Sequence, residues 1–391
     1  MSLIFFWSFT ITGITLFFCE FGTYYPESQL ATFLTGATAR NLILCFFILY
    51  AAYFSFNVLE RKVTLSGRIP YALNYFIKRF VILYSVTALI VLLGIFIVYG
   101  TPNQYQVDRF YYWENIAPSW GKYIQFLLIQ FSLFIGLFYA QSKSKLYLAI
   151  IFFSIMTQVF TGEKFTGPFL SLIMFFIPVI VLDNKNLFGI IFKLKSLVLL
   201  ITFCIVFYII ILSSYESIRG AENGTIFLFS RIALQSQMWW AVDNFSNLYE
   251  SASLPSILTH FIGFADSDAD TGMYYLMKVI TPSATFNRFY EQNITFTMAS
   301  PTNLIYFFSY PFAVIIALLL GTITGSIFWV VKNAIVLNDL VMIFLSLKLY
   351  YLIIRVLTMG EVFLLFNWKF LVYTLVIFTY VIISNKFTRD K

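Results

Sequence analysis

Long apolar runs are the feature that most constrains what this chain can fold into. Hydrophobic residues make up 60% of the 391 residues and charged residues only 11%, and the apolar residues come in runs of about 15 to 28. Such runs are long enough to cross about 30 Å of hydrocarbon as helices. Mean hydropathy is +0.84, far above that of soluble domains. We therefore expect an all-α polytopic membrane protein in contact with the lipid bilayer.

Ten transmembrane helices are predicted, and together they form a single domain over residues 1–391. The first is expected to be a true span, because no small-residue cleavage site follows it. The predicted spans are 3–19, 41–58, 80–99, 123–140, 146–160, 166–182, 196–212, 304–331, 340–357 and 366–383.

Basic residues predict the orientation of these spans. They concentrate in alternate loops and in the tail, which are cytoplasmic by the positive-inside rule. The intervening short loops carry only Arg40, Arg109, Lys122 and Lys164. Both termini are therefore predicted to be cytoplasmic. The net charge of +7 follows this topology and predicts no nucleic-acid partner. The three cysteines lack metal-ligand spacing, so we expect neither a metal nor a disulfide.

One loop is much longer than the others. Residues 213–303 face outward in this topology and contain amphipathic pieces, such as "LPSILTHFIGF" and "GMYYLMKVI". These pieces predict a large helical periplasmic loop folded on the membrane face.

The stretch "RIALQSQMWWAVDNF" in this loop suggests a binding surface. Arg231, Gln235, Trp239 and Asp243 recur every four residues, so on a helix they share one face. Planar rings together with fixed donors and acceptors suit sugar recognition. The alternative is an interfacial helix anchored by its tryptophans.

Two further places could bind an anion. Arg355 lies near the outer end of the ninth span, where a guanidinium is costly without a partner. It can bind pyrophosphate, snorkel, or pair with Glu361. The hairpin "FTGEKFTGPF" places Lys164 beside the start of the sixth span, which is also how a helix begins after a tight turn. Glu163, Glu216 and His260 are the candidate catalytic acids or bases.

With "GEKFTGP", "SRIALQSQMWW", "GMYYLM" and "TNLIYFFSYPFAVIIALLLG", the chain resembles the O-antigen polymerases, the Wzy family of bacterial envelope proteins. The resemblance implies a metal-independent glycosyltransferase of the bacterial inner membrane without a cofactor. Its substrate would be undecaprenyl pyrophosphate-linked oligosaccharide, polymerised at the periplasmic face, with a chain-length regulator as a possible partner protein. Loop arginines bind substrate in that family, which implies this role for Arg219 and Arg231, although the family's arginine-to-glycine spacing is absent. An O-antigen ligase, given His260, and a lipid-linked oligosaccharide flippase are the alternatives.

Overall fold

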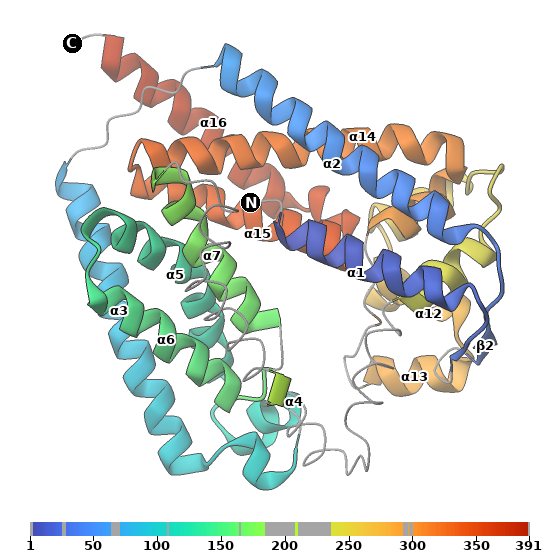
Figure 1. Ribbon diagram of the computed structural model, residues 1–391, viewed down its shortest axis with the longest axis horizontal. Helices are drawn as coiled ribbons and strands as arrows, with labels where there is room; N and C mark the ends of the chain where they lie inside the picture. Colours follow the sequence, from blue (N-terminus) through green and yellow to red (C-terminus); the bar gives the residue numbers. More distant parts are fainter. Residues whose placement is uncertain are drawn as a thin grey trace, which may run out of the picture. The chain divides into compact units, whose positions relative to one another are not determined.

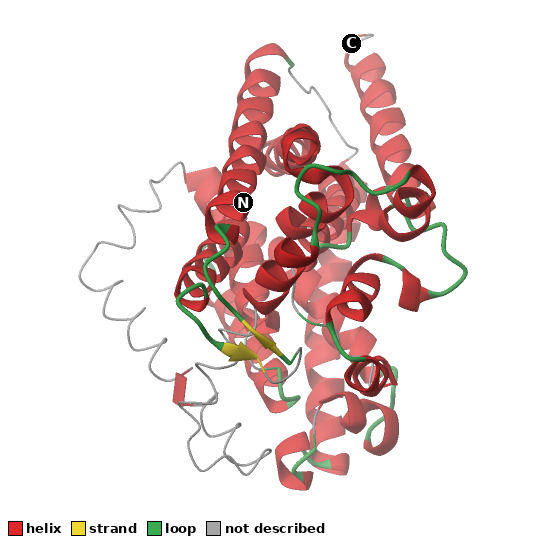
Figure 2. Ribbon diagram, turned by 90° about the vertical axis from the view of Figure 1, so that its right-hand side faces the viewer, coloured by secondary structure: helices red, strands yellow, loops and turns green. Residues whose placement is uncertain are grey.

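The computed structural model is built almost entirely of helices (Figure 1). It describes residues 3–25, 29–63, 71–107, 109–163, 166–183, 208–209, 236–291, 296 and 300–389. One two-stranded antiparallel hairpin is present, in which β1 (Tyr24–Tyr25) pairs with β2 (Leu30–Ala31) (Figure 2). The hairpin lies in the connection between the predicted spans 3–19 and 41–58.

The chain forms two compact units that are interleaved in the sequence. Unit 1 comprises Arg68–Leu228 with Ala334–Val341 and Met1, and unit 2 comprises Ser2–Gly67, Phe229–Asn333 and Met342–Lys391. The main helices of unit 1 are α3 (Tyr71–Tyr99), α5 (Gly121–Ser142), α6 (Lys145–Phe160) and α7 (Thr166–Asp183). Those of unit 2 are α1 (Leu3–Cys19), α2 (Ala37–Lys62), α14 (Ser300–Val336), α15 (Leu340–Met359) and α16 (Trp368–Arg389), of which α14 and α15 extend slightly past the division.

Five helices among the described residues are long and apolar enough to cross a membrane. They cover Ala37–Lys62, Ala72–Tyr105, Gly121–Ser142, Ser300–Val336 and Leu340–Met359. The helices α1, α6, α7 and α16 have shorter apolar segments, and they overlap four other predicted spans. The predicted span 196–212 lies outside the described residues apart from 208–209. The all-α membrane class is thus supported, whereas the number of ten spans stays a prediction.

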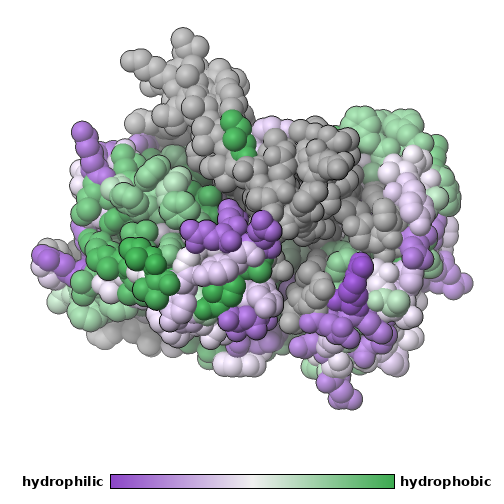
Figure 3. Space-filling view, turned by 90° about the horizontal axis from the view of Figure 1, so that it is seen from below, coloured by the Kyte–Doolittle hydropathy of each residue, from purple (hydrophilic) through white to green (hydrophobic). Residues whose placement is uncertain are grey.

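Many large apolar side chains lie on the surface of these helices. Figure 3 shows one face of the molecule, on which patches of hydrophobic residues lie beside patches of polar residues. Ile97 is 84% exposed and Tyr53 is 71% exposed, although both lie inside long helices. A water-exposed surface of this kind would be unfavourable, so these helix faces suit contact with lipid.

Small residues set the closest helix contacts within each unit. In unit 2, Gly321 and Gly325 of α14 lie against the backbone of α2, where a Cβ atom would come within 2.3 Å of the Ile48 carbonyl oxygen and 2.2 Å of the Ala52 carbonyl oxygen. In unit 1, a Cβ on Gly136 would lie 2.0 Å from the carbonyl oxygen of Phe175. Close backbone approach through glycine is typical of membrane helix pairs.

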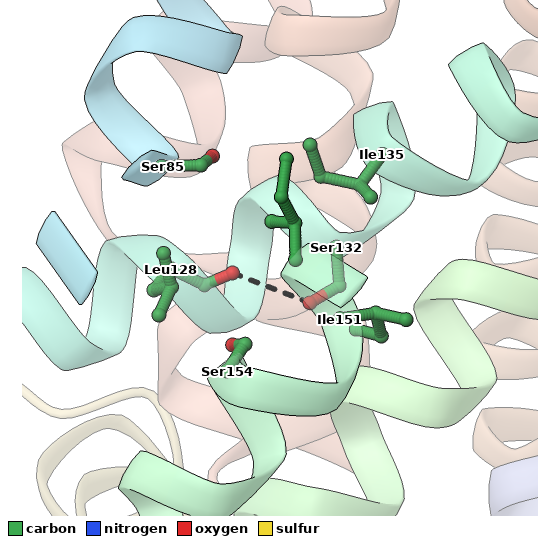
Figure 4. Close-up of a pocket in the computed structure, with 7 residues that line it drawn as sticks. Ser85, Leu128, Ser132, Ile135, Ile151 and Ser154 are labelled. Carbon is green, nitrogen blue, oxygen red and sulfur yellow. Dashed lines mark hydrogen bonds between the residues drawn. The ribbon is translucent and has the colours of Figure 1, made fainter. Parts of the chain in front are cut away.

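Three buried serines mark a further close contact in unit 1. Ser85 of α3, Ser132 of α5 and Ser154 of α6 line a small space together with Leu128 and isoleucines (Figure 4). The Ser132 hydroxyl donates to the carbonyl oxygen of Leu128 at 3.2 Å, and the Ser85 hydroxyl donates to that of Val81 at 2.8 Å. The Ser154 hydroxyl accepts a hydrogen bond from Gln158 Nε2 at 3.4 Å. Since all three hydroxyls bond within their own helices, the space is explained by helix packing.

The part of the large loop that the structure describes is folded, as predicted. Residues 236–245 are helical, and α11 (Leu254–Ser256) continues into a π-helical turn at Ile257–Phe261. A 3-10 turn at Asp268–Asp270 precedes α12 (Gly272–Ile280), and α13 (Ser283–Glu291) follows. Phe363, in the 3-10 turn Val362–Leu365, packs on Gly263 and Gly272, which have positive φ angles. The loop is therefore packed against the α15–α16 connection of unit 2.

Candidate functional site

A cluster of buried polar residues gathers in unit 2 around the start of α2. Its first member is Glu20, which follows α1 and is 5% exposed. Oε1 accepts hydrogen bonds from the backbone N–H groups of Thr35, Gly36 and Ala37 and from the Thr35 hydroxyl, at 2.7–3.1 Å. Oε2 accepts from the backbone N–H and the hydroxyl of Thr38, at 3.2 and 2.5 Å. The carboxylate therefore satisfies the free N–H groups and the positive end of α2.

Arg40, one turn into α2, forms a two-pronged ion pair with Asp243. Nη2 donates to Oδ1 at 2.5 Å and Nε donates to Oδ2 at 3.2 Å. The Asp243 side chain is fully buried, whereas the Arg40 side chain is 22% exposed. Asn41 Nδ2 also donates to Oδ2 at 3.4 Å. Parallel N–H···O bonds of this kind fix the plane and the orientation of the guanidinium.

The helical segment 236–245 brings Asp243 to this position. Its residues from Ser236 to Asp243 are buried on every side. Trp240 Nε1 donates to the carbonyl oxygen of Phe33 at 3.0 Å, and its ring meets the Phe33 ring edge-on. Trp239 is buried as well, and its Nε1 has no hydrogen-bond partner among the described residues. Burial of both tryptophans speaks against the interfacial-anchor alternative, because anchoring residues face the membrane surface.

A break in α14 comes one residue before Tyr310, whose hydroxyl interacts electrostatically with the same ion pair. Ser309 has φ 60° and ψ 161°, a strained conformation for a residue with a Cβ atom. The Tyr310 N–H donates to the carbonyl oxygen of Leu248 at 3.0 Å, and Pro311 then opens the longer half of the helix. Tyr310 is close enough to Arg40 and Asp243 to interact with their charges. In membrane proteins, irregular backbone at such a place occurs where it is buried in protein or lines a polar cavity.

The pKa values of the two carboxyl groups in the cluster are shifted in opposite directions. Burial raises the pKa of Glu20, but the hydrogen bonds from Thr38 and Thr35 lower it by more, so the pKa lies below its ordinary value of 4.5. Burial also raises the pKa of Asp243, and Arg40 offsets only part of that rise, so this pKa lies above 3.8. Without Arg40 the pKa of Asp243 would be raised further.

Several of the predicted site residues lie outside the described residues. These are Lys164, Glu216, Arg219, Arg231 and Gln235. Of the predicted helical face, Trp239 and Asp243 are described, and both are in the same helix, one turn apart. Asp243 contacts Arg40, a pairing that the sequence analysis did not consider. Sugar binding by this face stays a prediction.

His260 lies in the π-helical turn of unit 2, where its ring stacks on Tyr275. The ring centroids are 3.7 Å apart and the planes differ by 5°. Nδ1 lies 2.6 Å from the carbonyl oxygen of Asp270. Because a carbonyl can only accept, Nδ1 carries the proton, and in the neutral ring Nε2 has the lone pair. The fixed ring is compatible with either a structural or a basic role.

Glu163 lies in unit 1 and forms an ion pair with Arg109. It also lies close to the start of α7, since a Cβ on Gly167 would be 3.3 Å from its carboxyl carbon. The helix terminus that the sequence analysis proposed as an anion site therefore already has a carboxylate beside it.

Arg355 forms an ion pair with Glu361, which is one of the three roles that the sequence allows for it. Nη2 lies 2.5 Å from Oε2, and the Arg355 side chain remains 44% exposed. Asn303 Nδ2 donates to the carbonyl oxygen of Gly360 at 2.8 Å, which helps to hold the turn that carries Glu361. The pair explains how the guanidinium is accommodated, and it leaves part of the group accessible.

Sequence reasoning missed Glu20, Arg40 and Ser309 as members of a site. The predicted topology places Arg40 in a short outward-facing loop, and it places Ser309 inside the uninterrupted span 304–331. The signal for the break is Pro311 within an apolar run, because proline has no N–H to continue the helix and its ring clashes with the carbonyl group four residues earlier. No comparable local signal pairs Arg40 with Asp243.

Within the described residues, no group of three or more His, Cys, Asp or Glu side chains is placed to hold a metal ion. Cys19 and Cys45 are buried and are not joined by a disulfide, and Cys19 Sγ lies within hydrogen-bond distance of Ser236 Oγ, at 3.1 Å.

One family model matches the chain, over residues 266–374. It is described as a family of unknown function (DUF6418). The matched region includes α12 to α15, with the break at Ser309 and the Arg355–Glu361 pair, but neither Arg40 nor Asp243. Comparison with curated proteins and with solved structures gives no match.

Proposed function

We propose that this protein is a glycosyltransferase of the bacterial inner membrane that polymerises lipid-linked oligosaccharide repeat units at the periplasmic face. The observation that carries the proposal is the buried Arg40–Asp243 pair beside the break in α14. A partly exposed guanidinium held rigidly at one end of apolar helices suits a lipid-linked diphosphate, whose charge lies at the membrane surface.

The ion pairs support the proposed topology, because each joins segments predicted to lie on the same side. In unit 2, Arg40 and Asp243 are both predicted outside, and Lys332 and Glu60 are both predicted inside. In unit 1, Arg109 and Glu163 are predicted outside, and Lys143 and Asp183 are predicted inside. Reporter fusions after residues 65, 143, 190 and 388 should be cytoplasmic. A fusion at residue 250 should be periplasmic, and a cytoplasmic signal there would overturn the topology.

The proposed reaction needs a charge-stabilising group and a base. The bond between the anomeric carbon and the carrier diphosphate breaks, and a hydroxyl of the acceptor repeat unit forms the new glycosidic bond. Arg40 stabilises the negative charge that develops on the leaving diphosphate. The hydroxyl proton passes to a base, for which His260 Nε2 is suited by the Nδ1 bond to Asp270. The carrier diphosphate is released.

Deletion of the gene tests this function. We expect the deletion strain to accumulate single repeat units on their lipid carrier at the periplasmic face. Purified full-length protein in vesicles should then convert that lipid fraction into a ladder of longer chains. Unattached polymer in the deletion strain would instead indicate a ligase, and repeat units confined to the cytoplasmic face would indicate a flippase. Either result would reject the polymerase proposal.

A further inference from the structure

An open apolar groove lies in unit 2 where α1 ends and α2 begins. Its volume is about 290 Å³, and the residues that line it include Phe17, Glu20, Phe21, Leu34, Gly36 and Ala39. Phe21 is 75% exposed and Leu34 is 79% exposed. Large apolar side chains around a groove at the end of membrane helices suit a hydrocarbon chain.

Arg40 presents one unused edge of its guanidinium beside this groove. Nε and Nη2 donate to Asp243, and Nη2 also donates to the carbonyl oxygen of Thr35 at 2.9 Å. Nη1 has no hydrogen-bond partner among the described residues, and its two N–H groups remain available. The bonds on the other edge hold Nη1 in place, so it can bind an anion without losing much side-chain entropy.

Gly36 connects the free edge to the groove. It lines the groove, and a Cβ at this position would lie 3.2 Å from Arg40 Nη1. The φ angle of 80° is also one that favours glycine. With no side chain at Gly36, the guanidinium edge lies at the margin of the groove.

Glu20 does not prevent an anion from binding at that margin. Its two oxygens accept the six hydrogen bonds described above, and they lie at the positive end of α2. These donors offset part of the negative charge of Glu20, which still acts on Arg40 and Asp243.

We infer that this groove binds the lipid carrier, with the isoprenoid chain along Phe17, Phe21 and Leu34 and the diphosphate at Arg40 Nη1. The inference rests on the proposed function and assigns the carrier end of the substrate to a specific place. An apolar groove that ends at guanidinium N–H groups without an acceptor among the described residues is complementary to a lipid whose chain ends in a diphosphate. The occupant is the carrier lipid, and bulk phospholipid is the alternative that the test separates.

The test is binding of undecaprenyl diphosphate to the purified full-length protein, measured by native mass spectrometry. Ala39→Phe fills the groove from an exposed position that does not touch the ion pair. We expect it to weaken binding about tenfold. Ile43→Phe, one turn later on α2 and 43% exposed, is the matched control and should bind like the wild type. Arg40→Lys should also weaken binding, because lysine cannot pair with Asp243 and present a second planar edge.

The outcomes distinguish this inference from the proposed function. Undiminished binding by Ala39→Phe, or displacement of the carrier by an equal concentration of phosphatidylglycerol, would overturn the groove assignment. Weaker binding by Ala39→Phe with a normal Ile43→Phe would support it, even if the vesicle assay yields no polymer. If the vesicle assay yields polymer and Ala39→Phe binds undecaprenyl diphosphate normally, the proposed function would be supported and the assignment of the groove as the carrier site would be rejected.

Discussion

Arg40 and Asp243 are 203 residues apart in the sequence, yet they form a two-pronged ion pair inside unit 2. The pair is asymmetric, because the Asp243 side chain is fully buried and the Arg40 side chain is 22% exposed. It ties the start of α2 to the helical segment 236–245. The large loop is thereby fixed to the first helices of the chain.

The asymmetry predicts unequal effects of removing the two partners. Arg40→Leu leaves a buried carboxylate without its cation and should destabilise the protein by about 3 kcal/mol or more. Asp243→Leu leaves a guanidinium that can still reach solvent, so its cost should be smaller. Thermal unfolding in detergent, followed by size-exclusion chromatography, measures both. Equal losses, or a larger loss for Asp243→Leu, would contradict this account.

Glu20 should contribute stability that depends on pH. Its pKa is lower in the folded protein than the ordinary value of 4.5, because the hydrogen bonds from Thr38 and Thr35 outweigh the opposing effect of burial. A lowered carboxyl pKa stabilises the folded state above about pH 4.5, and this contribution is lost as the pH falls through the folded pKa.

Comparing the wild type with Glu20→Gln isolates this contribution, because other titrating groups cancel in the difference. We expect Glu20→Gln to lower the unfolding temperature at pH 7 and to lower it progressively less as the pH falls below about 4.5. A difference that is constant over this range would show that the charge of Glu20 is not what stabilises the start of α2.

The backbone at Ser309 should be relieved by glycine. At φ 60° and ψ 161° a serine is strained, whereas glycine adopts this region readily. Ser309→Gly should therefore stabilise the protein by about 1 kcal/mol. The control is Ser346→Gly at a buried position within the regular helix α15, which should destabilise by a comparable amount. If Ser309→Gly is the more destabilising of the two, the strain is not significant.

The sequence predicted the helices better than it predicted how they meet. The first predicted span, 3–19, coincides with α1 because apolar residues fill that helix from end to end. In contrast, α3 begins at Tyr71, nine residues before the predicted start at 80, because the helix continues through polar residues such as Asn74 and Lys78. The length of an apolar run indicates which part of a helix suits the membrane, but it does not indicate where the helix begins or ends.

The candidate site depends on contacts that periodicity cannot reveal. The spacing of four correctly placed Trp239 and Asp243 in one helix, but it could not show that both are buried or that Asp243 faces Arg40. The break at Ser309 was readable in principle from the proline two residues later. The position of that break beside Arg40 and Asp243 was not, because it follows from the packing of segments far apart in the chain.

The role of His260 can be tested with a variant that keeps the hydrogen bond made by Nδ1 but removes the basic nitrogen Nε2. Nδ1 donates to the Asp270 carbonyl oxygen, and the proposed base is Nε2. In His260→Asn the side-chain amide can replace the Nδ1 donor, but it offers no basic nitrogen at the position of Nε2. If His260 is the base, this variant should accumulate normally and lose about 100-fold or more in polymerisation rate.

Tyr275→Phe is the matched control, because it keeps the ring that stacks on His260 and removes only the hydroxyl that lies 3.3 Å from Tyr306. The vesicle assay, run beside a measurement of protein abundance, compares the two variants. A normal polymer ladder from His260→Asn would make His260 a structural residue and leave Glu163 and Glu216 as the remaining candidates for the base.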